Sequence, residues 1–447
     1  MPQRYDVCIV GGGITGLAAA YYLERISRQS SVSYAILEAS AAFGGKIQTD
    51  QLRTPDGEFL LEKGPDSFLT QKPWALQLAK ALCLEEELIP INADARGFCV
   101  LKRGRPQPIL PFLLSPVISP LGKLRMGLEP FVPHRKDISD ESVAQFARRR
   151  LGQEAFDYLA EPLMSGIFSA DPEQQSMQAT FPRFLDIERQ HKSLLLRMRR
   201  GGQDPSFLSY RNGMGTLVKT LVKTLQGRQT SSCGVEMISL LAPNKFQVLL
   251  KSGERVECSR LLLTVPAASA ATMLPANYPA LRTKLQELRT TSSGCIYLSF
   301  ANHDIRRVLT GTGLVIPRVE RRAINAITYV SSKFPGRAPE GQTLLRVFFG
   351  GSRNPKIMHQ NDEAIAQIAL QELESLLGIA ARPSLSQVYR YQNGNPQYDV
   401  GHVAKSEALM RALPDGLFLA GSSYRGGGIP DCIYEGQRIA EKINASL

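Results

Sequence analysis

The first chemically informative feature is a glycine-rich turn near the N-terminus. Directly after the apolar run at 5–10 come Gly11, Gly12, Gly13, Ile14, Thr15 and Gly16. Gly11 permits a tight turn, Gly13 lets phosphates approach the backbone, and Gly16 lets the following helix pack close to the strand. Free N–H groups at the start of that helix favour negative charge. These residue types at this spacing predict a dinucleotide-binding turn.

The elements around this turn are those that a dinucleotide fold requires. The pattern predicts a buried strand at 5–10, a helix from 14 to about 26 and a second buried strand at 32–37. Glu38 ends the second strand, where its carboxylate can accept hydrogen bonds from a ribose. A chance glycine-rich turn would need none of these elements, so we interpret the segment as a dinucleotide site.

Two further loops indicate which dinucleotide is bound. Ala39 leads into the first loop, where two glycines allow close contact with a diphosphate and a lysine supplies charge: Gly44, Gly45 and Lys46. The second loop consists of Gly64, Pro65, Asp66 and Ser67. Both loops resemble those beside the flavin in flavoproteins of the amine oxidase group. An ordinary turn is the alternative for the second loop. Together the loops favour FAD.

A second glycine-rich segment, at 421–431, follows a predicted strand at the other end of the chain. It includes Gly421, Gly427 and Gly428, and Ile429 then leads into Pro430 at the first turn of a helix. Free N–H groups there can stabilise negative charge on a reduced flavin ring. A plain glycine loop is the alternative. We expect the two ends of the chain to meet at one FAD site.

Composition narrows the possible partners. Lys and Arg number 53 against 41 Asp and Glu, which gives a net charge of +12 and suits anionic partners. The basic residues are scattered without an aromatic–basic motif, so we expect no nucleic acid. The 7 Cys and 5 His show no ligand spacing, so we expect no metal and a reducing, cytoplasmic location. We also expect no signal peptide, because the first residues lead straight into a predicted strand. We expect no membrane span, because prolines interrupt the uncharged stretch at 261–281.

Nearly the whole chain resembles the oxygen-dependent protoporphyrinogen oxidase family. The resemblance rests on Glu-Pro-Leu-Met-Ser-Gly-Ile-Phe at 161–168, Ala-Thr-Phe-Pro at 179–182, Phe-Pro-Gly-Arg-Ala-Pro at 334–339, Phe-Gly-Gly-Ser-Arg at 349–353 and Gly-Ile-Pro-Asp-Cys-Ile at 428–433. It implies non-covalent FAD, a porphyrinogen substrate and molecular oxygen as the acceptor. The implied mechanism is hydride transfer from a meso carbon to the flavin N5, followed by proton loss from a pyrrole nitrogen. Three such rounds remove six electrons. No side chain identifies itself as the general base.

The resemblance also implies an α/β fold with a Rossmann-like FAD-binding domain built from separate segments. We assign 1–85, 205–270 and 385–447 to that domain. A mixed-sheet substrate-binding domain takes 86–108 and 271–384, and a helical subdomain takes 109–204. In the family the helical subdomain can associate with membranes and dimers are common. The run at 109–114 with Val117 and Ile118, flanked by basic residues, could accordingly lie on an anionic membrane surface, or be buried within its own lobe or a dimer.

The resemblance places further residues at the site. Val235 should contact FAD. Phe348 matches an aromatic that packs on the macrocycle, and Val315 and Ile327 are the expected aliphatic contacts. Phe98 stands where plant-type members have an arginine, which leaves Arg96 as the candidate for a propionate; a solvated loop arginine is the alternative. Ala170 replaces a glycine whose carbonyl faces the pyrrole nitrogens.

Other functions remain open at this stage. Coproporphyrinogen III is the alternative substrate, since its additional carboxylates would suit a basic pocket. An amine oxidase or a carotenoid desaturase would share the fold. A non-catalytic carrier of flavin or tetrapyrrole is the alternative outside enzymes.

Overall fold

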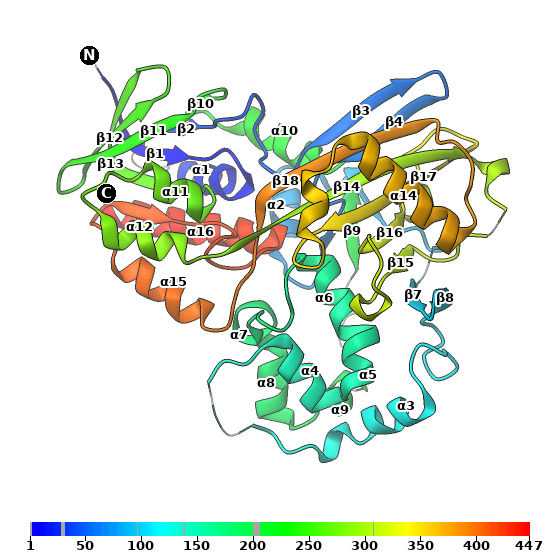
Figure 1. Cartoon of the computed structure of the whole chain (residues 1–447). Coiled ribbons are helices and arrows are strands. Elements are labelled where there is room, and N and C mark those ends of the chain that lie inside the picture. The colour runs from blue at the N-terminus through cyan, green and yellow to red at the C-terminus, as the bar shows by residue number, and fades with distance from the viewer. Residues whose placement is uncertain are drawn as a thin grey trace.

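Two mixed α/β lobes and a helical lobe make up the chain (Figure 1). The computed structural model describes residues 2–27, 32–95, 97–135, 137, 139–199, 206–306 and 308–447. The predicted fold class is confirmed: a flavin-type α/β lobe is assembled from distant segments beside a mixed sheet and a group of helices. The residue boundaries that we assigned to the three parts stay predictions.

The first sheet has the order β10-β2-β1-β13-β12-β11, with β19 also paired to β13. Its centre is parallel, and β11 and β12 add an antiparallel edge. The last four residues of β1 and all of β2 are buried, which is why their sequences are continuous apolar runs. The strands are β1 (Gln3–Val10), β2 (Tyr34–Leu37), β10 (Arg228–Thr230), β11 (Val235–Ala242), β12 (Lys245–Leu250), β13 (Arg255–Leu263) and β19 (Leu417–Leu419).

Helices from both ends of the chain cover one face of this sheet. Helix α1 (Ile14–Ile26) crosses α16 (Ile429–Ser446), and both contribute to one apolar core. The crossing is close at Gly436, where a Cβ atom would lie 2.7 Å from the Thr15 carbonyl oxygen and 2.8 Å from Ala18 Cβ. The two ends of the chain therefore meet, as the sequence predicted (Figure 1). The same core includes residues of α2 (Trp74–Ala81) and α10 (Gly215–Thr224).

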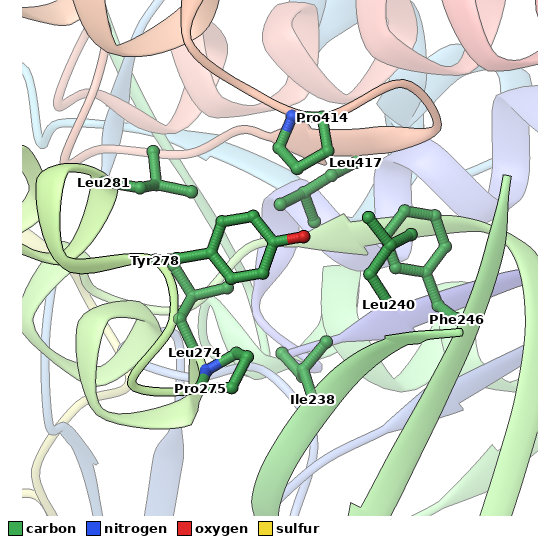
Figure 2. A pocket seen from close by; sticks show the side chains of 9 residues that line it. All are labelled: Ile238, Leu240, Phe246, Leu274, Pro275, Tyr278, Leu281, Pro414 and Leu417. Atoms are coloured by element: carbon green, nitrogen blue, oxygen red, sulfur yellow. The ribbon is translucent and has the colours of Figure 1, made fainter. Parts of the chain in front are cut away.

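The opposite face is covered by helices that include α11 (Ala267–Met273), α12 (Pro279–Gln286) and α15 (His402–Arg411). A small apolar hollow lies there, and the ring of Tyr278 extends between Leu281 and Leu240 (Figure 2). Its volume is about 10 Å³, room for roughly one water molecule. This hollow is a packing defect of the core and is far too small for a tetrapyrrole.

The second sheet has the order β18-β14-β17-β16-β15-β7-β8. Helix α14 (Asp362–Leu377) packs on one face over Ile296 and Val347, while the other face carries Cys295, Tyr297 and Phe348. That second face also packs against the β3–β4 hairpin. The strands of the sheet are β14 (Thr290–Ala301), β15 (Gly313–Val315), β16 (Ala326–Tyr329), β17 (Gln342–Gly350), β18 (Leu385–Pro396), β7 (Cys99–Lys102) and β8 (Arg105–Pro108). The separate hairpin consists of β3 (Thr49–Thr54) and β4 (Gly57–Glu62).

A short three-stranded connection and a group of helices complete the fold. The connection contains β5 (Phe68–Leu69), β9 (Phe207–Tyr210) and β6 (Leu88–Pro90). Ser142 caps α4 through a capping box with Gln145. Arg150, in the last turn of the same helix, forms a fully buried ion pair with Glu129. The helices are α3 (Pro120–Gly127), α4 (Val143–Leu151), α5 (Gln153–Ala155), α6 (Glu161–Phe168), α7 (Met177–Thr180), α8 (Pro182–His191) and α9 (Leu194–Arg199), with α13 (Val330–Lys333) in the second lobe.

The structure decides between the two alternatives for part of the apolar run in the helical lobe. Val117 and Ile118 are buried within the protein, at 0% and 1% exposure, against Val100 of β7, and so do not lie on a membrane-facing surface. Within the described residues, no helix is both long enough and apolar enough to cross a bilayer.

Candidate active site

The first glycine-rich turn is shaped by backbone contacts that a side chain would prevent. Gly11 has φ +109° and its N–H donates to the Leu37 carbonyl at 2.8 Å. A Cβ on Gly16 would lie 2.2 Å from the Gly11 carbonyl oxygen, whereas a Cβ on Gly13 would meet nothing within 4 Å. Gly13 is the N-cap of α1 and leaves the helix without a side-chain cap. The turn thus presents an open backbone surface and free N–H groups.

Glu38 lies against this turn, as the sequence predicted. One oxygen of its carboxylate accepts from Gly12 N and the other from Ser40 N, each at 2.7 Å. The Glu38 carbonyl accepts from Cys233 N at 2.7 Å, which brings the start of β11 and the buried Val235 close to Ala39. The carboxylate is therefore held in place at the end of β2, where a ribose would be bound.

The second predicted loop touches the first. Gly44 N donates to Gly12 O at 2.8 Å, and a Cβ on Gly45 would lie 3.3 Å from Gly13 Cα. The ammonium of Lys46 donates to the Gly394 carbonyl near the end of β18, and burial lowers the pKa of Lys46. Lys46 therefore joins the glycine turns to the second sheet, a contact that its expected role at the diphosphate did not predict.

The C-terminal glycine segment closes on the same place. Gly421 has φ +114°, and a Cβ there would lie 3.7 Å from Thr15 Oγ1. Gly427 and Gly428 precede Ile429, where α16 begins without a side-chain cap. The N-termini of α1 and α16 thus both offer unsatisfied N–H groups in one region.

The Gly64–Ser67 loop is fixed by charged residues of the second lobe. Arg346 donates to the Gly64 carbonyl at 2.7 Å and to the Lys63 carbonyl at 3.1 Å. Asp66 pairs with Lys333 at 2.8 Å and accepts from the Ser67 hydroxyl at 2.7 Å. Burial alone would raise the pKa of Asp66, but the charges of Lys333 and Arg346 lower it to about 2. Sequence patterns missed Arg346 and Lys333, because neither residue belongs to a motif and their partners in the Gly64–Ser67 loop are distant in the sequence.

These features fit a dinucleotide with a flavin. The backbone at Gly13 has no side chain and no described neighbour in front of it, so phosphates could approach it. The helices α1 and α16 both begin without a side-chain cap. Hydrogen bonds from Gly12 N and Ser40 N hold the Glu38 carboxylate at the end of β2. The contacts of the individual predicted residues with FAD stay predictions. Among the described residues, no group of His, Cys, Asp and Glu is arranged to hold a metal ion.

The predicted substrate residues divide into two groups. Phe348 is half-buried on the face of β17 that carries Arg346, whose guanidinium carbon lies 4.6 Å from the ring centroid. Val315 is partly buried near Val100. Ala170 is 1% exposed and follows Ser169, whose carbonyl accepts from Ser352 N at 2.9 Å. Their contacts with substrate stay predictions.

Ile327 and Arg96 are the two predicted substrate residues that do not belong to this group. Ile327 pairs in register with Val347, so it points to the α14 side of the sheet and is 1% exposed in that core. Side chains of successive strand residues alternate between faces, so Ile327 lies on the face opposite Phe348. Its burial against α14 gives no support to a substrate contact, which stays a prediction. Arg96 lies outside the described residues.

Comparison with known proteins identifies the class. The family model described as flavin containing amine oxidoreductase matches residues 14–444. The chain therefore belongs to the flavin-containing amine oxidoreductase family, and it is a flavin-dependent oxidoreductase whose cofactor is FAD.

Named relatives narrow the group further. The chain is 35% identical to a coproporphyrinogen III oxidase of Bacillus subtilis, with 97% of each chain covered. It is 29% identical to the chloroplastic protoporphyrinogen oxidase 1 of Spinacia oleracea, over 98% of this chain and 84% of that one. A crystal structure named "Putative protoporphyrinogen oxidase from Exiguobacterium sp. 255-15" superposes with a TM-score of 0.86 at 29% identity, and all of both chains is covered. The predicted resemblance is confirmed.

Proposed function

We propose that this protein oxidises a porphyrinogen to the porphyrin, with non-covalent FAD as the cofactor and molecular oxygen as the final acceptor. The observation that carries the proposal is the contact of Arg346 with both the Gly64 carbonyl and the Phe348 ring. It places the loop expected beside the flavin next to an aromatic side chain of the second sheet. A large apolar macrocycle gains most of its binding energy from burial against such a wall.

The residues of the chain position the reaction rather than react. FAD, when bound, supplies a two-electron acceptor that oxygen can reoxidise. Phe348 would hold the macrocycle by stacking, and Arg346 holds both Phe348 and the Gly64 loop. We assign no proton-transfer residue. Catalysis on this account rests on orientation and on exclusion of water.

Two porphyrinogens fit this account, and we propose coproporphyrinogen III as the preferred one. The sequence alone placed protoporphyrinogen IX first. Three relatives at 35%, 30% and 29% identity are named coproporphyrinogen III oxidases, while the named plant and animal protoporphyrinogen oxidases match at 26–29%. The net charge of +12 also suits the substrate with more carboxylates.

A direct assay tests the proposal. Purified protein with its flavin absorbance recorded is given coproporphyrinogen III and protoporphyrinogen IX separately in air, and porphyrin fluorescence is followed against an enzyme-free control. We expect faster formation of coproporphyrin III. A preference for protoporphyrinogen IX would reverse the substrate order, and a flavin-bound protein that oxidises neither would favour the carrier alternative.

We further propose that the helical lobe attaches to an anionic membrane surface. Its described residues expose a row of large apolar side chains, defined here as the apolar row: Leu110, Leu113, Leu114, Leu121, Leu124 and Phe131. Leu113, Leu114 and Phe131 are each more than four-fifths exposed, and Lys123 and Arg125 lie within the same stretch. Exposed apolar side chains beside basic ones suit a lipid surface. A homodimer through this face is the competing proposal.

A further inference from the structure

A polar hollow lies where three strands of the second sheet end. It has a volume of about 360 Å³, and hydroxyl and amide groups line it: Thr290, Thr291, Ser292, Ser352, Gln392 and Asn393. His359 lines it as well, and none of the described residues at its wall is Asp or Glu. Pro355 and Met358 also line the hollow, and the Thr291 hydroxyl already donates to the Ser169 carbonyl at 3.3 Å. The remaining hydroxyl and amide groups can donate hydrogen bonds, and a wall that holds them without a carboxylate suits an anionic group.

The hollow is next to the segments that the site brings together. Asn393 precedes Gly394, whose carbonyl accepts from Lys46 of the predicted FAD loop. On the other side, Gly351 N donates to Ser292 O at 2.7 Å and Ser352 N donates to Ser169 O at 2.9 Å. Ser169 directly precedes Ala170, a predicted substrate contact. The hollow therefore lies between the cofactor loop and a predicted substrate segment.

Arg318 contacts one residue of the hollow's wall, Ser352, and so supplies a cation next to it. Its Nη2 donates to Ser352 Oγ at 3.0 Å and lies 3.9 Å from Asp171 Oδ1. The side chain is 38% exposed; its buried Nε lies 3.7 Å from Glu161 Oε1, so the exposed part of the guanidinium is its terminal nitrogens. Arg318 follows Val315 by three residues and so belongs to the same segment as a predicted substrate contact.

The neighbouring arginine is not available in the same way. Arg353 is 8% exposed and donates to both oxygens of Glu161, at 3.0 and 3.3 Å, and to the Ile316 carbonyl at 2.6 Å. Glu161 also accepts from the Arg318 backbone N–H at 2.9 Å, which fixes the start of this turn. Both arginines therefore face Glu161, but Arg353 is buried against it at hydrogen-bond distance, while the Arg318 guanidinium is 38% exposed and lies 3.7 Å or more from its carboxylates.

We propose that Arg318, with Ser352 and the polar hollow, binds a propionate carboxylate of the porphyrinogen. The inference rests on the proposed function and deepens it. Coproporphyrinogen III carries propionates at two ring positions where protoporphyrinogen IX carries vinyl groups. A charge-assisted contact at one of these positions would therefore favour the substrate with more carboxylates.

The test compares Arg318→Gln with the wild-type holoenzyme. For Arg318→Gln we expect the KM for coproporphyrinogen III to rise about tenfold with little change in kcat, which corresponds to one charge-assisted hydrogen bond. The KM for protoporphyrinogen IX should rise less than about twofold. Binding of the oxidised ligands, measured by fluorescence titration with coproporphyrin III and mesoporphyrin IX, should show the same difference without turnover.

Three further variants guard against a purely structural effect. Arg318→Lys should recover part of the coproporphyrin III affinity, and Ser352→Ala should weaken it without disturbing Arg353. Arg322→Gln is the matched control, because Arg322 is 27% exposed and pairs with Glu372 of α14 instead. Equal losses for both ligands, or none, in Arg318→Gln and Ser352→Ala would overturn the inference. Failure of the wild type to oxidise either porphyrinogen would overturn the proposed function itself.

Discussion

The guanidinium carbon of Arg346 lies 4.6 Å from the centre of the Phe348 ring, on the same face of β17. Arg346 is 4% exposed, and the same group donates to the carbonyl oxygens of Lys63 and Gly64. One side chain therefore connects an aromatic residue of the second sheet to the loop expected beside FAD. Cofactor loop and aromatic wall are held as one unit.

Arg346→Met should weaken both functions of this unit. It removes the guanidinium donor from two partly buried carbonyls, of which, within the described residues, only that of Lys63 keeps a weak donor, the Cys295 thiol, and this costs about 2–3 kcal/mol of stability. We expect a lower Tm, weaker retention of FAD and a higher KM for porphyrinogen, with Arg346→Lys intermediate. Arg390→Met is the control, because Arg390 pairs with Asp362 at the other side of the sheet. If the KM in Arg346→Met stayed at the wild-type value, the link between Arg346 and the substrate wall would be refuted.

The close crossing of α1 and α16 gives a second prediction. Gly436→Ala places a Cβ 2.7 Å from the Thr15 carbonyl oxygen and 2.9 Å from Ala19 N, so the helices must separate. Overpacking of this kind costs about 1–3 kcal/mol. Thermal unfolding should show a lower Tm and the purified protein should contain less FAD. Gly127→Ala is the control, because a Cβ there meets nothing within 4 Å; an equal response of both variants would contradict the account.

The Asp66–Lys333 pair predicts a pH dependence of stability. The pKa of Asp66 is about 2 in the folded protein against an ordinary value of 3.8. A lowered carboxyl pKa stabilises the fold fully above pH 3.8, and this contribution disappears as the pH falls toward 2. Asp66→Asn should therefore reduce the free energy of unfolding by about 2 kcal/mol at neutral pH and leave it nearly unchanged near pH 2. Urea unfolding at several pH values measures this; a constant difference across that range would argue against the ion pair.

The apolar row predicts binding to lipid vesicles. The double variant Leu113→Glu with Leu114→Glu should lose flotation with anionic liposomes at low salt while keeping its Tm, because both side chains are exposed at 81% and 82%. Val308→Glu, at an equally exposed apolar residue elsewhere, should bind as the wild type does. If the wild type does not float, the membrane proposal fails; a shift from dimer to monomer in the double variant would support the competing interface.

Local patterns predicted the FAD lobe well. The buried strands are continuous apolar runs in the sequence. Gly11 and Gly16 are required because a Cβ atom at either position would collide with Thr264 or with the Gly11 carbonyl oxygen. The crossing of α1 with α16 could be expected only because both ends carry helix N-termini suited to one cofactor. The close approach at Gly436 depends on tertiary packing that no local pattern shows.

The second sheet was harder to predict because its site residues depend on register. Ile327 and Phe348 are both apolar strand residues, and only the pairing of Ile327 with Val347 shows that they face opposite sides. For Val117 and Ile118 the sequence left a membrane surface and burial both open, because apolar residues suit either, and only the structure shows that both side chains are buried. Arg346 and Arg318 carry no motif, and their roles come from partners distant in the sequence.

Anaerobic mixing of the purified flavoprotein with coproporphyrinogen III tests the central claim most directly. The account predicts that the oxidised flavin absorbance is bleached as porphyrin appears, and that it returns when oxygen is admitted. A flavin that stays oxidised with both coproporphyrinogen III and protoporphyrinogen IX would contradict porphyrinogen oxidation by this protein.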